Sequence, residues 1–350
     1  MVQRFLPGRS RGGAGHFAHG LARALVERGH AVTMVSEDPP PDDARYESVR
    51  VPVPAAGWRR RLAPLSFPFR VARLDFSRFD LIHAHGDDQL IRRRRAPPVV
   101  RTLHGSAWLE AVHNGWRRRS PKLFGLHLYF YAGELVADLR ADQVVAVSRD
   151  TGRYYPRLDG VVPNGIDIER FAPRGGAKSE RPTILFVGEA ASRKRGDLLL
   201  RVVRESVRPG LPDLRVWMVS PDRVEEEGVE WFDRIDDDRL ADLYRAAWIL
   251  CLPSSYEGFG RPYAEALAAG TPVVASPNPG AREVLEDGRY GVIARDDDLG
   301  GALLSLLRDG PRRADLARRG LERARAFSWE RVAARYERIY DAALARRRAS

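Results

Sequence analysis

The chain has 350 residues, 44% of them hydrophobic and 30% charged, a balance typical of a globular protein of about two domains. This composition excludes a disordered, collagen-like or coiled-coil chain, and no apolar run approaches the ~18 residues of a membrane span. The net charge of +11 divides as +10 over residues 1–180, −6 over 181–310 and +7 over 311–350. Cys251 is the only cysteine and residues 1–13 lack the apolar stretch of a signal peptide, so we expect a cytoplasmic protein without an internal disulfide.

In the first half of the chain, short apolar runs alternate with helical patterns. We expect strands at 31–35, 49–53, 81–84, 99–103 and 144–147, and helices at 17–28, at 122–139 and directly after Ser148. Only residues 1–6 precede the glycine-containing segment 7–13. The strand that normally opens a doubly wound domain is therefore either short or begins upstream of Met1.

The second half repeats this alternation. Strands are expected at 183–187, 214–219, 248–252, 272–275 and 292–294, and helices at 197–208, 238–247, 262–269, 281–286 and 299–307. Such alternation is typical of parallel sheets covered by helices on both faces, so the chain is predicted to hold two Rossmann-like domains. Proline and glycine residues mark 173–181 as the linker between a first domain at 1–172 and a second at 182–327.

The segment 253–270, PSSYEGFGRPYAEALAAG, carries the strongest chemical signal. It follows the expected strand 248–252 and opens a helix, in which Pro262 suits the first turn. Gly258 and Gly260 allow a ligand to approach the backbone closely, and the free N–H groups of a helix start can bind a pyrophosphate. The segment therefore predicts a phosphate-containing ligand at the carboxyl edge of the second sheet, where ligands bind in such folds.

Two carboxylates lie in this segment. Glu257 is in the loop, and Glu265 lies eight residues later inside the helix, where it can face the same crevice. Carboxylates suit sugar and ribose hydroxyls because one carboxylate accepts two hydrogen bonds.

With this spacing the chain resembles the retaining nucleotide-sugar glycosyltransferases of glycosyltransferase family 4, also called group 1. Their Glu-(seven residues)-Glu motif is matched by Glu257 and Glu265. The resemblance extends over nearly the whole chain, through weaker matches in the family's order at 12–13, 21–25, 28–33, 79–85, 144–148, 162–167, 269–274 and 327–329.

The resemblance implies an α/β protein of the GT-B fold, with two Rossmann-like domains around an interdomain cleft and a final helix, 328–350, crossing back to the first domain. It implies that Glu257 holds hydroxyls of the donor sugar and that Glu265 holds those of the ribose. The amides of Gly258, Phe259 and Gly260 would line the donor. The substrates implied are a nucleotide diphosphate sugar and a sugar or lipid-linked acceptor, and the resemblance implies neither a cofactor nor an essential metal.

The family also implies a basic pair after the first strand of the second domain, where it neutralises the diphosphate. The first of these positions holds Glu189 where members commonly carry arginine. The second basic position is present in the run 193–195, and we assign it to Lys194, with Arg195 as the alternative register. Either Glu189 points away from the diphosphate or Arg193 compensates for its charge.

Two further positions are implied in the first domain. His104 follows the expected strand 99–103 and matches the family's active-site histidine, which contacts the donor sugar. Gly12 and Gly13 would let their loop pass close to the donor phosphate. The histidine also permits a plainer interpretation, a strand-end residue bonded to backbone, and the glycines permit a simple tight turn.

Two histidine pairs have a spacing that could suit metal ligands. His83 and His85 share one face of a strand, and His16 and His19 share one face of a helix. Neither pair has a cysteine or an evident carboxylate to complete a zinc site, so no metal is expected.

Clusters of arginine beside aromatic residues indicate a surface for anionic lipid. Phe67, Phe69 and Trp116 are expected to add apolar insertion, and the protein is expected to dock on the inner face of the cell membrane. A solvated surface in an arginine-rich protein is the alternative, and nucleic acid is not expected because no recognition motif is present. The arginines are Arg59, Arg60, Arg61, Arg92, Arg93, Arg94, Arg95, Arg117, Arg118 and Arg119.

The function predicted is retaining sugar transfer in the synthesis of cell-envelope glycan, polysaccharide or glycolipid. Two alternatives share the fold: a GT-B sugar-nucleotide epimerase, and a catalytically dead protein that binds a nucleotide sugar. A dinucleotide oxidoreductase is disfavoured because no G-x-G-x-x-G follows a strand and opens a helix.

Overall fold

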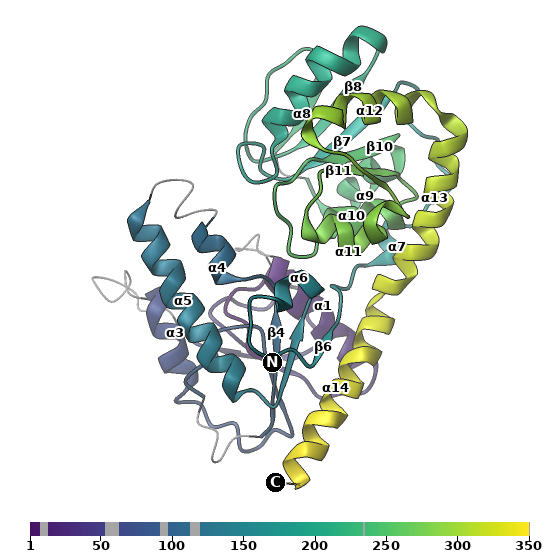
Figure 1. The fold of residues 1–350 in the computed structure, drawn as a ribbon. Helices are drawn as coiled ribbons and strands as arrows, with labels where there is room; N and C mark the ends of the chain where they lie inside the picture. The colour runs from purple at the N-terminus through teal and green to yellow at the C-terminus, as the bar shows by residue number, and fades with distance from the viewer. Residues whose placement is uncertain (8–12, 53–62, 92–96, 113–119, 234, 350) are drawn as a thin grey trace. The chain divides into compact units, whose positions relative to one another are not determined.

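The computed structural model describes residues 1–350 except 8–12, 53–62, 92–96, 113–119, 234 and 350. It divides into two compact units (Figure 1). Unit 1 consists of Met1–Gly165 and Trp329–Ser350, and unit 2 consists of Ile166–Ser328. Each unit contains parallel strands alternating with helices, which confirms the predicted α/β class.

The sheet of unit 1 is parallel throughout. β1 (Thr33–Ser36) pairs with β2 (Glu47–Arg50), and a second group runs in the order β3 (Ile82–Ala84), β4 (Val99–Leu103), β5 (Gln143–Ala146) and β6 (Gly160–Val161). Val2 joins the two groups, because it bridges Val35 of β1 and Ala84 of β3. Val2 thus occupies the position between β1 and β3 at which the opening strand of such a domain runs.

Unit 1 carries helices from both ends of the chain: α1 (Gly13–Glu27), α3 (Ala63–Val71), α4 (Ala107–Glu110), α5 (Pro121–Arg140), α6 (Arg149–Gly152) and α14 (Trp329–Ala349). Phe17 of α1, Val100 of β4 and Tyr336 of α14 belong to one buried apolar cluster. The ring of Trp329 contacts the places where Gly20 and Gly165 lack a side chain. The final helix therefore completes the core of unit 1, as expected for a helix that crosses back.

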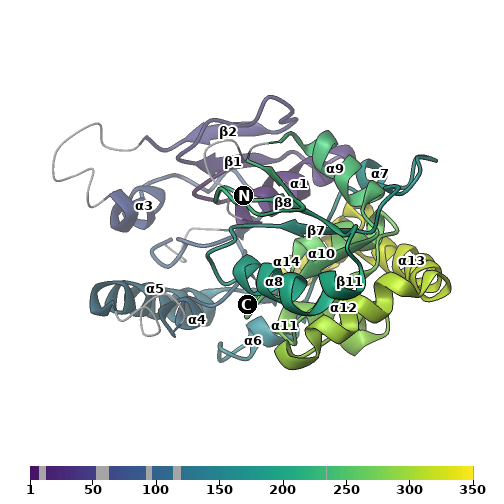
Figure 2. The ribbon, with the colours of Figure 1, turned by 90° about the horizontal axis from the view of Figure 1, so that it is seen from above.

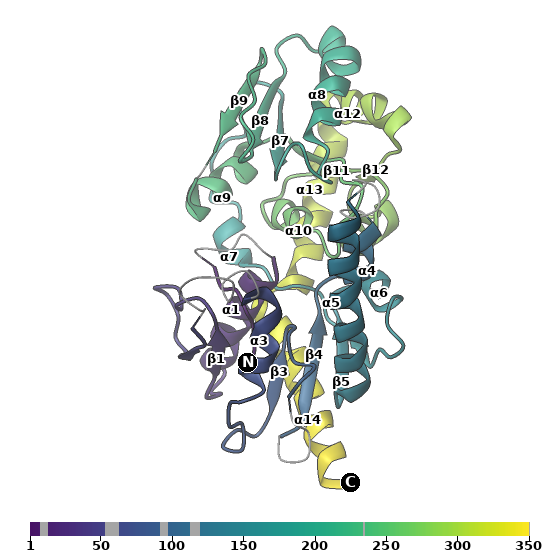
Figure 3. The same cartoon turned by 90° about the vertical axis from the view of Figure 1, so that its left-hand side faces the viewer.

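The sheet of unit 2 has six parallel strands in the order β12–β11–β10–β7–β8–β9, and Figure 3 shows β7, β8 and β9 side by side. The strands are β7 (Thr183–Val187), β8 (Arg215–Val219), β9 (Val229–Phe232), β10 (Ile249–Leu252), β11 (Val273–Ala275) and β12 (Val292–Ile293). All four residues of the central strand β10 are buried, as expected for a strand covered on both faces.

The helices of unit 2 are α7 (Ile168–Phe171), α8 (Gly196–Val202), α9 (Asp237–Ala246), α10 (Arg261–Ala268), α11 (Pro279–Leu285), α12 (Leu299–Arg308) and α13 (Gly310–Ala324). After α8 the chain continues through a π-helical turn, η2 (Val203–Val207), and a short 3₁₀ turn, η3 (Arg208–Gly210). Three more 3₁₀ turns are η4 (Glu286–Gly288), η5 (Asp296–Asp298) and η6 (Arg325–Phe327). α10 packs against α13 and β11 and so places the start of α10 at the carboxyl edge of the sheet.

Residues 166–181 pack with unit 2. Phe171 of α7 meets the ring of Tyr244 edge-on at 5.4 Å, and Lys178 Nζ donates to Ala247 O and Thr271 Oγ1 at 2.9 and 2.8 Å. The units accordingly divide between Gly165 and Ile166, upstream of the predicted linker 173–181.

The predicted strands and helices are present with ends shifted by a few residues, but several elements were missed. β6 and β9 are short and only partly buried, so they lack the apolar run that marks a strand. α3 contains Pro68, which argues against a helix. α13 buries Leu316, Gly320 and Ala324 among many charged residues, so its apolar pattern is weak. No helix among the described residues is long and apolar enough to cross a bilayer.

Candidate active site

The loop between β10 and α10 positions the first predicted glutamate. Gly260, at the N-cap of α10, has φ +84°, a left-handed conformation that L side chains rarely adopt. A Cβ atom there would also meet the ring of Tyr263, so glycine is required for both reasons. The turn and the proline that follows begin α10 abruptly, which leaves the loop 253–260 at the carboxyl edge of the sheet.

Glu257 is 4% exposed and surrounded by cations. Its Oε1 lies 2.7 Å from Lys194 Nζ and 2.9 Å from Arg193 Nη1, and it accepts a hydrogen bond from Ser254 Oγ at 2.8 Å. Burial alone would raise the pKa of Glu257, but the charges of Lys194 and Arg193 outweigh it and hold that pKa below its ordinary value. Glu257 is therefore ionised at neutral pH.

The loop between β7 and α8 supplies these cations. Lys194 faces Glu257, whereas Arg195 forms a bidentate pair with Asp296, at 2.7 and 3.0 Å, and donates to Pro253 O at 2.6 Å. Of the two registers left open by the sequence, Lys194 is the residue next to Glu257, and Arg195 holds the loop to Asp296.

Glu189 is exposed in the same loop. Arg193 pairs with Glu257 and donates to Tyr256 O at 2.7 Å. Arg193 is thus engaged beside Glu257, and Glu189 is exposed to solvent.

Glu265 lies one turn into α10 and is 6% exposed. It accepts a hydrogen bond from Tyr244 Oη at 2.9 Å and pairs with Arg261 at 3.2 Å. Burial and the nearby Glu265 raise the pKa of Tyr244 well above its ordinary value, so the tyrosine stays a donor. Glu265 is oriented by two partners on its own unit.

Phe259 and the first residues of α11 hold the loop 253–260 in place through packing and hydrogen bonds. The Phe259 side chain is buried edge-on against Phe327 at 5.4 Å, while Gly258 is half-buried. Gly280 N donates to Glu257 O at 2.9 Å, and a Cβ at Gly280 would lie 2.6 Å from Phe259 O. Asn278 donates to Ser254 O at 3.1 Å. Sequence reasoning missed Ser254, Asn278 and Gly280; the Asn-Pro-Gly run at 278–280 was the available signal.

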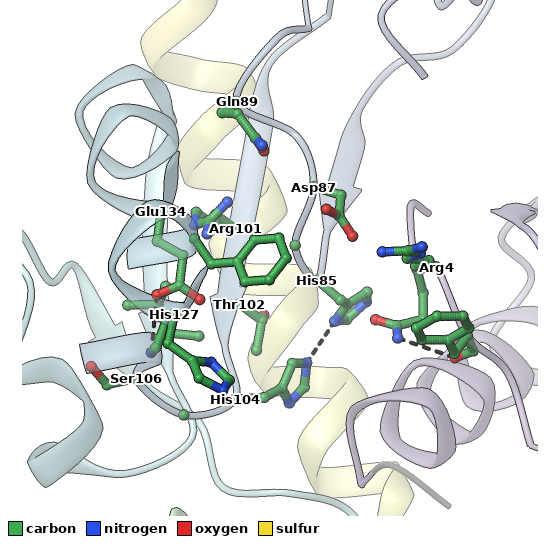
Figure 4. Close-up of a pocket in the computed structure, with 17 residues that line it drawn as sticks. Arg4, His85, Asp87, Gln89, Arg101, Thr102, His104, Ser106, His127 and Glu134 are labelled. Atoms are coloured by element: carbon green, nitrogen blue, oxygen red, sulfur yellow. Dashed lines mark hydrogen bonds between the residues drawn. The ribbon is translucent and has the colours of Figure 1, made fainter. Parts of the chain in front are cut away.

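Unit 1 contains a second group of polar residues, around a pocket of about 370 Å³ at the carboxyl ends of β3 and β4 (Figure 4). His104, which follows β4, lines it together with His85, which follows β3. His85 Nδ1 and His104 Nε2 lie 3.0 Å apart in a hydrogen bond. The position predicted for His104 at a strand end is thus at the pocket.

Both histidines are neutral. Burial lowers the pKa of His104 to about 3, and burial with the nearby His83 lowers that of His85 well below its ordinary value. His85 Nε2 and His104 Nδ1 are buried and have no hydrogen-bond partner among the described residues. Since one neutral imidazole donates to the other, one of these two nitrogens carries a hydrogen and the other accepts. The pair offers one donor and one acceptor in either tautomer.

His83 lies behind this pair. Its ring is 4.2 Å from that of His85, centroid to centroid, which confirms that the two share a strand face. His83 is bonded to Tyr340 Oη at 2.8 Å and to Thr102 Oγ1 at 2.7 Å, so α14 supports the site. His19 is bonded instead to Tyr46 Oη at 2.9 Å. No group of three His, Cys, Asp or Glu side chains suited to a metal occurs in the part of the chain that the structure describes.

Acidic and basic side chains that sequence reasoning missed also line the pocket. Burial raises the pKa of Asp87 to about 6, and burial raises that of Glu134, which accepts a hydrogen bond from Tyr155 Oη at 2.5 Å. Arg101 lines the pocket and pairs with Asp88 in the interior. The run HAHGDD at 83–88 was the available signal, because it places four polar residues at one strand end.

The remaining predicted residues either do not line the pocket of unit 1 or lie outside the described residues. Gly13 begins α1, with open space around its Cα, and Gly12 lies outside the described residues. The ten predicted lipid-facing arginines, at 59–61, 92–95 and 117–119, and Trp116 also lie outside them. Phe67 is fully buried in the core of unit 1, so the expectation that it inserts into lipid is wrong: its ring fills the space beside Val2 and Val71. Phe69 is 55% exposed.

Comparison with known proteins gives the class of both units. The family model for glycosyl transferases group 1 matches residues 167–323, and that for glycosyltransferase family 4 matches residues 11–170. The two matches cover the strand-end loops of both sheets, so the protein is a glycosyltransferase of the GT-B fold. The chain belongs to the group 1 family, which confirms the resemblance seen in its sequence.

Two relatives match most of the chain. The phosphatidyl-myo-inositol mannosyltransferase of Mycolicibacterium smegmatis is 28% identical, over 92% of this chain and 88% of its own. The D-inositol 3-phosphate glycosyltransferase of Geodermatophilus obscurus is 30% identical, over 95% of this chain and 85% of its own.

Two solved structures share the fold. Sucrose-phosphate synthase of Thermosynechococcus elongatus has a TM-score of 0.77 at 21% identity, over 94% of this chain and 93% of its own. Anabaena HepE, solved with UDP and glucose, has a TM-score of 0.73 at 17% identity, over 97% of this chain and 98% of its own.

Proposed function

We propose that the protein transfers a hexosyl group from a nucleotide diphosphate sugar to an acceptor hydroxyl, with retention at the anomeric carbon. The observation that carries this proposal is the buried, ionised Glu257 beside Lys194 and Arg193 at the carboxyl edge of the second sheet. An anion accepts sugar hydroxyls and the adjacent cations attract a diphosphate, so one small region provides for both halves of such a donor. The structure of HepE with UDP and glucose supports a donor of this class.

Within unit 2, Glu257 binds hydroxyls of the transferred sugar and Glu265 binds those of the ribose. The amides of Gly258, Phe259 and Gly260 line the donor, and Lys194 neutralises the diphosphate. Lysine and arginine supply the positive charge that a metal ion supplies in other transferases, which supports activity without a divalent cation. In unit 1, we assign His104 and the loop at Gly12 and Gly13 to donor binding, as the resemblance implies.

We assign binding of the acceptor mostly to unit 1. The leaving diphosphate assists removal of the proton from that hydroxyl, a front-face route to retention that uses no protein nucleophile. The two relatives are named for a phosphatidylinositol and an inositol phosphate, which supports a sugar, polyol or lipid-linked acceptor and a role in cell-envelope glycan or glycolipid synthesis. We place the enzyme in the cytoplasm, docked peripherally on the inner face of the membrane, because unit 1 and the tail carry the excess of positive charge.

The experiment is a thermal-shift panel of nucleotides and nucleotide sugars, followed by transfer assays with the stabilising donor. NMR of the product's anomeric proton reads out retention. Glu257→Gln should abolish transfer, whereas Glu205→Gln, an exposed glutamate of the same unit, is the matched control and should leave it unchanged. Epimerised donor in the absence of acceptor would identify an epimerase, and stabilisation without product from any acceptor would identify a binding protein.

A further inference from the structure

α5 has its apolar residues on the wrong side for a helix of a water-surrounded domain. Among the described residues, nine large apolar side chains are exposed, and five belong to α5: Leu123, Leu128, Tyr129, Val136 and Leu139, at 38–68% exposure. Its acidic residues point inward, since Asp138 is fully buried and Glu134 is bonded to Tyr155. An ordinary surface helix shows the reverse pattern.

Three of these side chains, together with Ala132, form one continuous stripe, from which Leu123 is separated. Leu128, Ala132, Val136 and Leu139 are spaced by four, four and three residues, which at 3.6 residues per turn places them on the same side of the helix. Tyr129 borders the stripe on the same outer face. Scattered single apolar residues are normal on a protein surface, but a contiguous stripe marks an interaction site.

A neighbouring helix extends this surface. α4 lies beside α5 (Figure 2), and its Trp108, 38% exposed, lies 6.0 Å from the ring of Tyr131. Tryptophan and tyrosine favour the boundary between lipid headgroups and acyl chains, because their rings are apolar and their N–H and O–H groups are polar.

The charges on α5 suit an anionic partner. Its two exposed cations are Lys122 in the first turn and Arg140 in the last, and both lie at the rim of the stripe. Arg140 Nη1 also donates to Gln89 O at 2.7 Å and keeps its charge at the surface. Because Glu134 and Asp138 face inward, the outer face of the helix carries positive charge only. A second copy of the chain would oppose cations to cations, whereas anionic lipid headgroups complement them.

We propose that the outer face of α5, from Lys122 to Arg140, is the surface by which the protein docks on an anionic membrane. The helix lies in the interface plane, with Leu128, Val136 and Leu139 among the acyl chains and the cations at headgroup level. The inner side of the same helix lines the unit 1 pocket through His127 and Glu134, so docking brings that pocket to the membrane surface. This inference deepens the membrane docking proposed above and assigns it to described residues.

Vesicle binding of the full chain tests it, without donor or acceptor, so that its outcome is independent of glycosyl transfer. Vesicles of phosphatidylcholine with phosphatidylglycerol, mixed about two to one, should bind the protein, and pure phosphatidylcholine should bind it weakly. Leu128→Ser, Val136→Ser and Leu139→Ser combined should weaken binding by about ten-fold or more. Leu158→Ser removes a leucine of unit 1 outside α5 that is about as exposed as Leu128, at 39% against 41%, and should have no effect.

The charge contribution is separated by a second variant. Lys122→Gln with Arg140→Gln should weaken binding to anionic vesicles by about five-fold for each cation, with no change on neutral vesicles. The remaining binding should be less sensitive to salt than that of the unchanged protein.

A labelling experiment is independent of how the serine variant folds. Cys251 is fully buried, so a cysteine introduced at Val136 is the one that a thiol-reactive fluorescent dye reaches. The emission of the dye at Val136→Cys should shift to the blue on anionic vesicles, while the dye at Leu158→Cys should not. Equal shifts at both positions, unchanged binding of the serine variant, or a dimer that dissociates on the serine substitutions would each overturn the proposal.

Discussion

The Nζ atom of Lys194 lies 2.7 Å from Oε1 of Glu257, so the cation assigned to the diphosphate is paired in advance with the anion assigned to the sugar. A donor that reaches both residues must insert between or beside two charges that already satisfy each other. Binding therefore exchanges an internal ion pair for contacts with the ligand, and the loss of either residue leaves the other without its charge partner.

Replacing the two glutamates should affect different kinetic constants. Glu257→Ala should collapse kcat, because we assign the transferring sugar to this residue, and Glu265→Ala should raise the donor KM, because we assign the ribose to it. Loss of a charged hydrogen bond is worth about 1.5–3 kcal/mol, or roughly ten- to a hundred-fold. Steady-state kinetics measure both constants, and wild-type activity in Glu257→Ala would remove it from the site.

Two of the three cations in the β7–α8 loop, Lys194 and Arg195, should have separable effects on ligand binding and on stability. Lys194→Ala should weaken binding of nucleoside diphosphate far more than binding of nucleoside, because its amine is the nearer to Glu257. Arg195→Ala should lower the melting temperature instead, because it breaks the bidentate contact with Asp296. Calorimetric titration with both ligands checks this, and equal losses for nucleoside and diphosphate would show that Lys194 does not contact phosphate.

The buried histidines should make the protein sensitive to acid. In the folded state the pKa of His104 is lowered from 6.5 to about 3. Between these two values the histidine is protonated in the unfolded chain and neutral in the folded chain. The contribution of this histidine to the free energy of unfolding is therefore fully present above pH 6.5. It falls as the pH drops toward 3, by about 1.4 kcal/mol per pH unit for each such histidine. Urea unfolding from pH 7 to pH 4 measures it, and His104→Gln should flatten the dependence.

Activity should survive EDTA, because Lys194 and Arg193, which lie next to Glu257, supply positive charge at the position that we propose for the diphosphate. The measurement is initial rate before and after chelation and dialysis. A loss of rate restored by magnesium or manganese would contradict a reaction without metal.

The contact between α1 and α14 should not tolerate a side chain. Gly20→Ala places a methyl group in the ring of Trp329 and should destabilise the protein by about 1–3 kcal/mol. Gly125→Ala, in the interior of α5 with nothing near its Cα, is the matched control and should be neutral or stabilising by up to ~1 kcal/mol. Thermal unfolding of the two variants gives the difference.

Much of this arrangement was predictable because strand ends in parallel sheets carry the site. Glu257 and His104 were placed correctly at such ends, since the runs 248–252 and 99–103 are clearly apolar and the polar residues follow directly. The partners of these residues were not predictable. The contacts His85–His104 and Arg195–Asp296 join residues 19 and 101 positions apart, and only the packing of separate strands and helices brings them together.

α5 shows a different limit of sequence reasoning. Its helix was predicted from 122 to 139, but a periodicity identifies an apolar stripe without saying which side of it faces the protein. Burial of Asp138 and exposure of Leu139 are set by the tertiary structure.

The position of α14 has a consequence for synthesis on the ribosome. Val332, Ala333 and Tyr336 lie in the same apolar cluster as Phe17 and Val100, so the core of unit 1 stays incomplete until the last helix has been translated. Unit 2 is one uninterrupted stretch whose ends are joined by the Ile166–Ser328 bridge, and it has all its residues as soon as Ser328 emerges. Folding during translation usually proceeds from the amino terminus. Here we expect the reverse order, in which unit 1 is synthesised first but reaches its native fold after unit 2. Until α14 has been synthesised, part of the apolar core of unit 1 stays exposed.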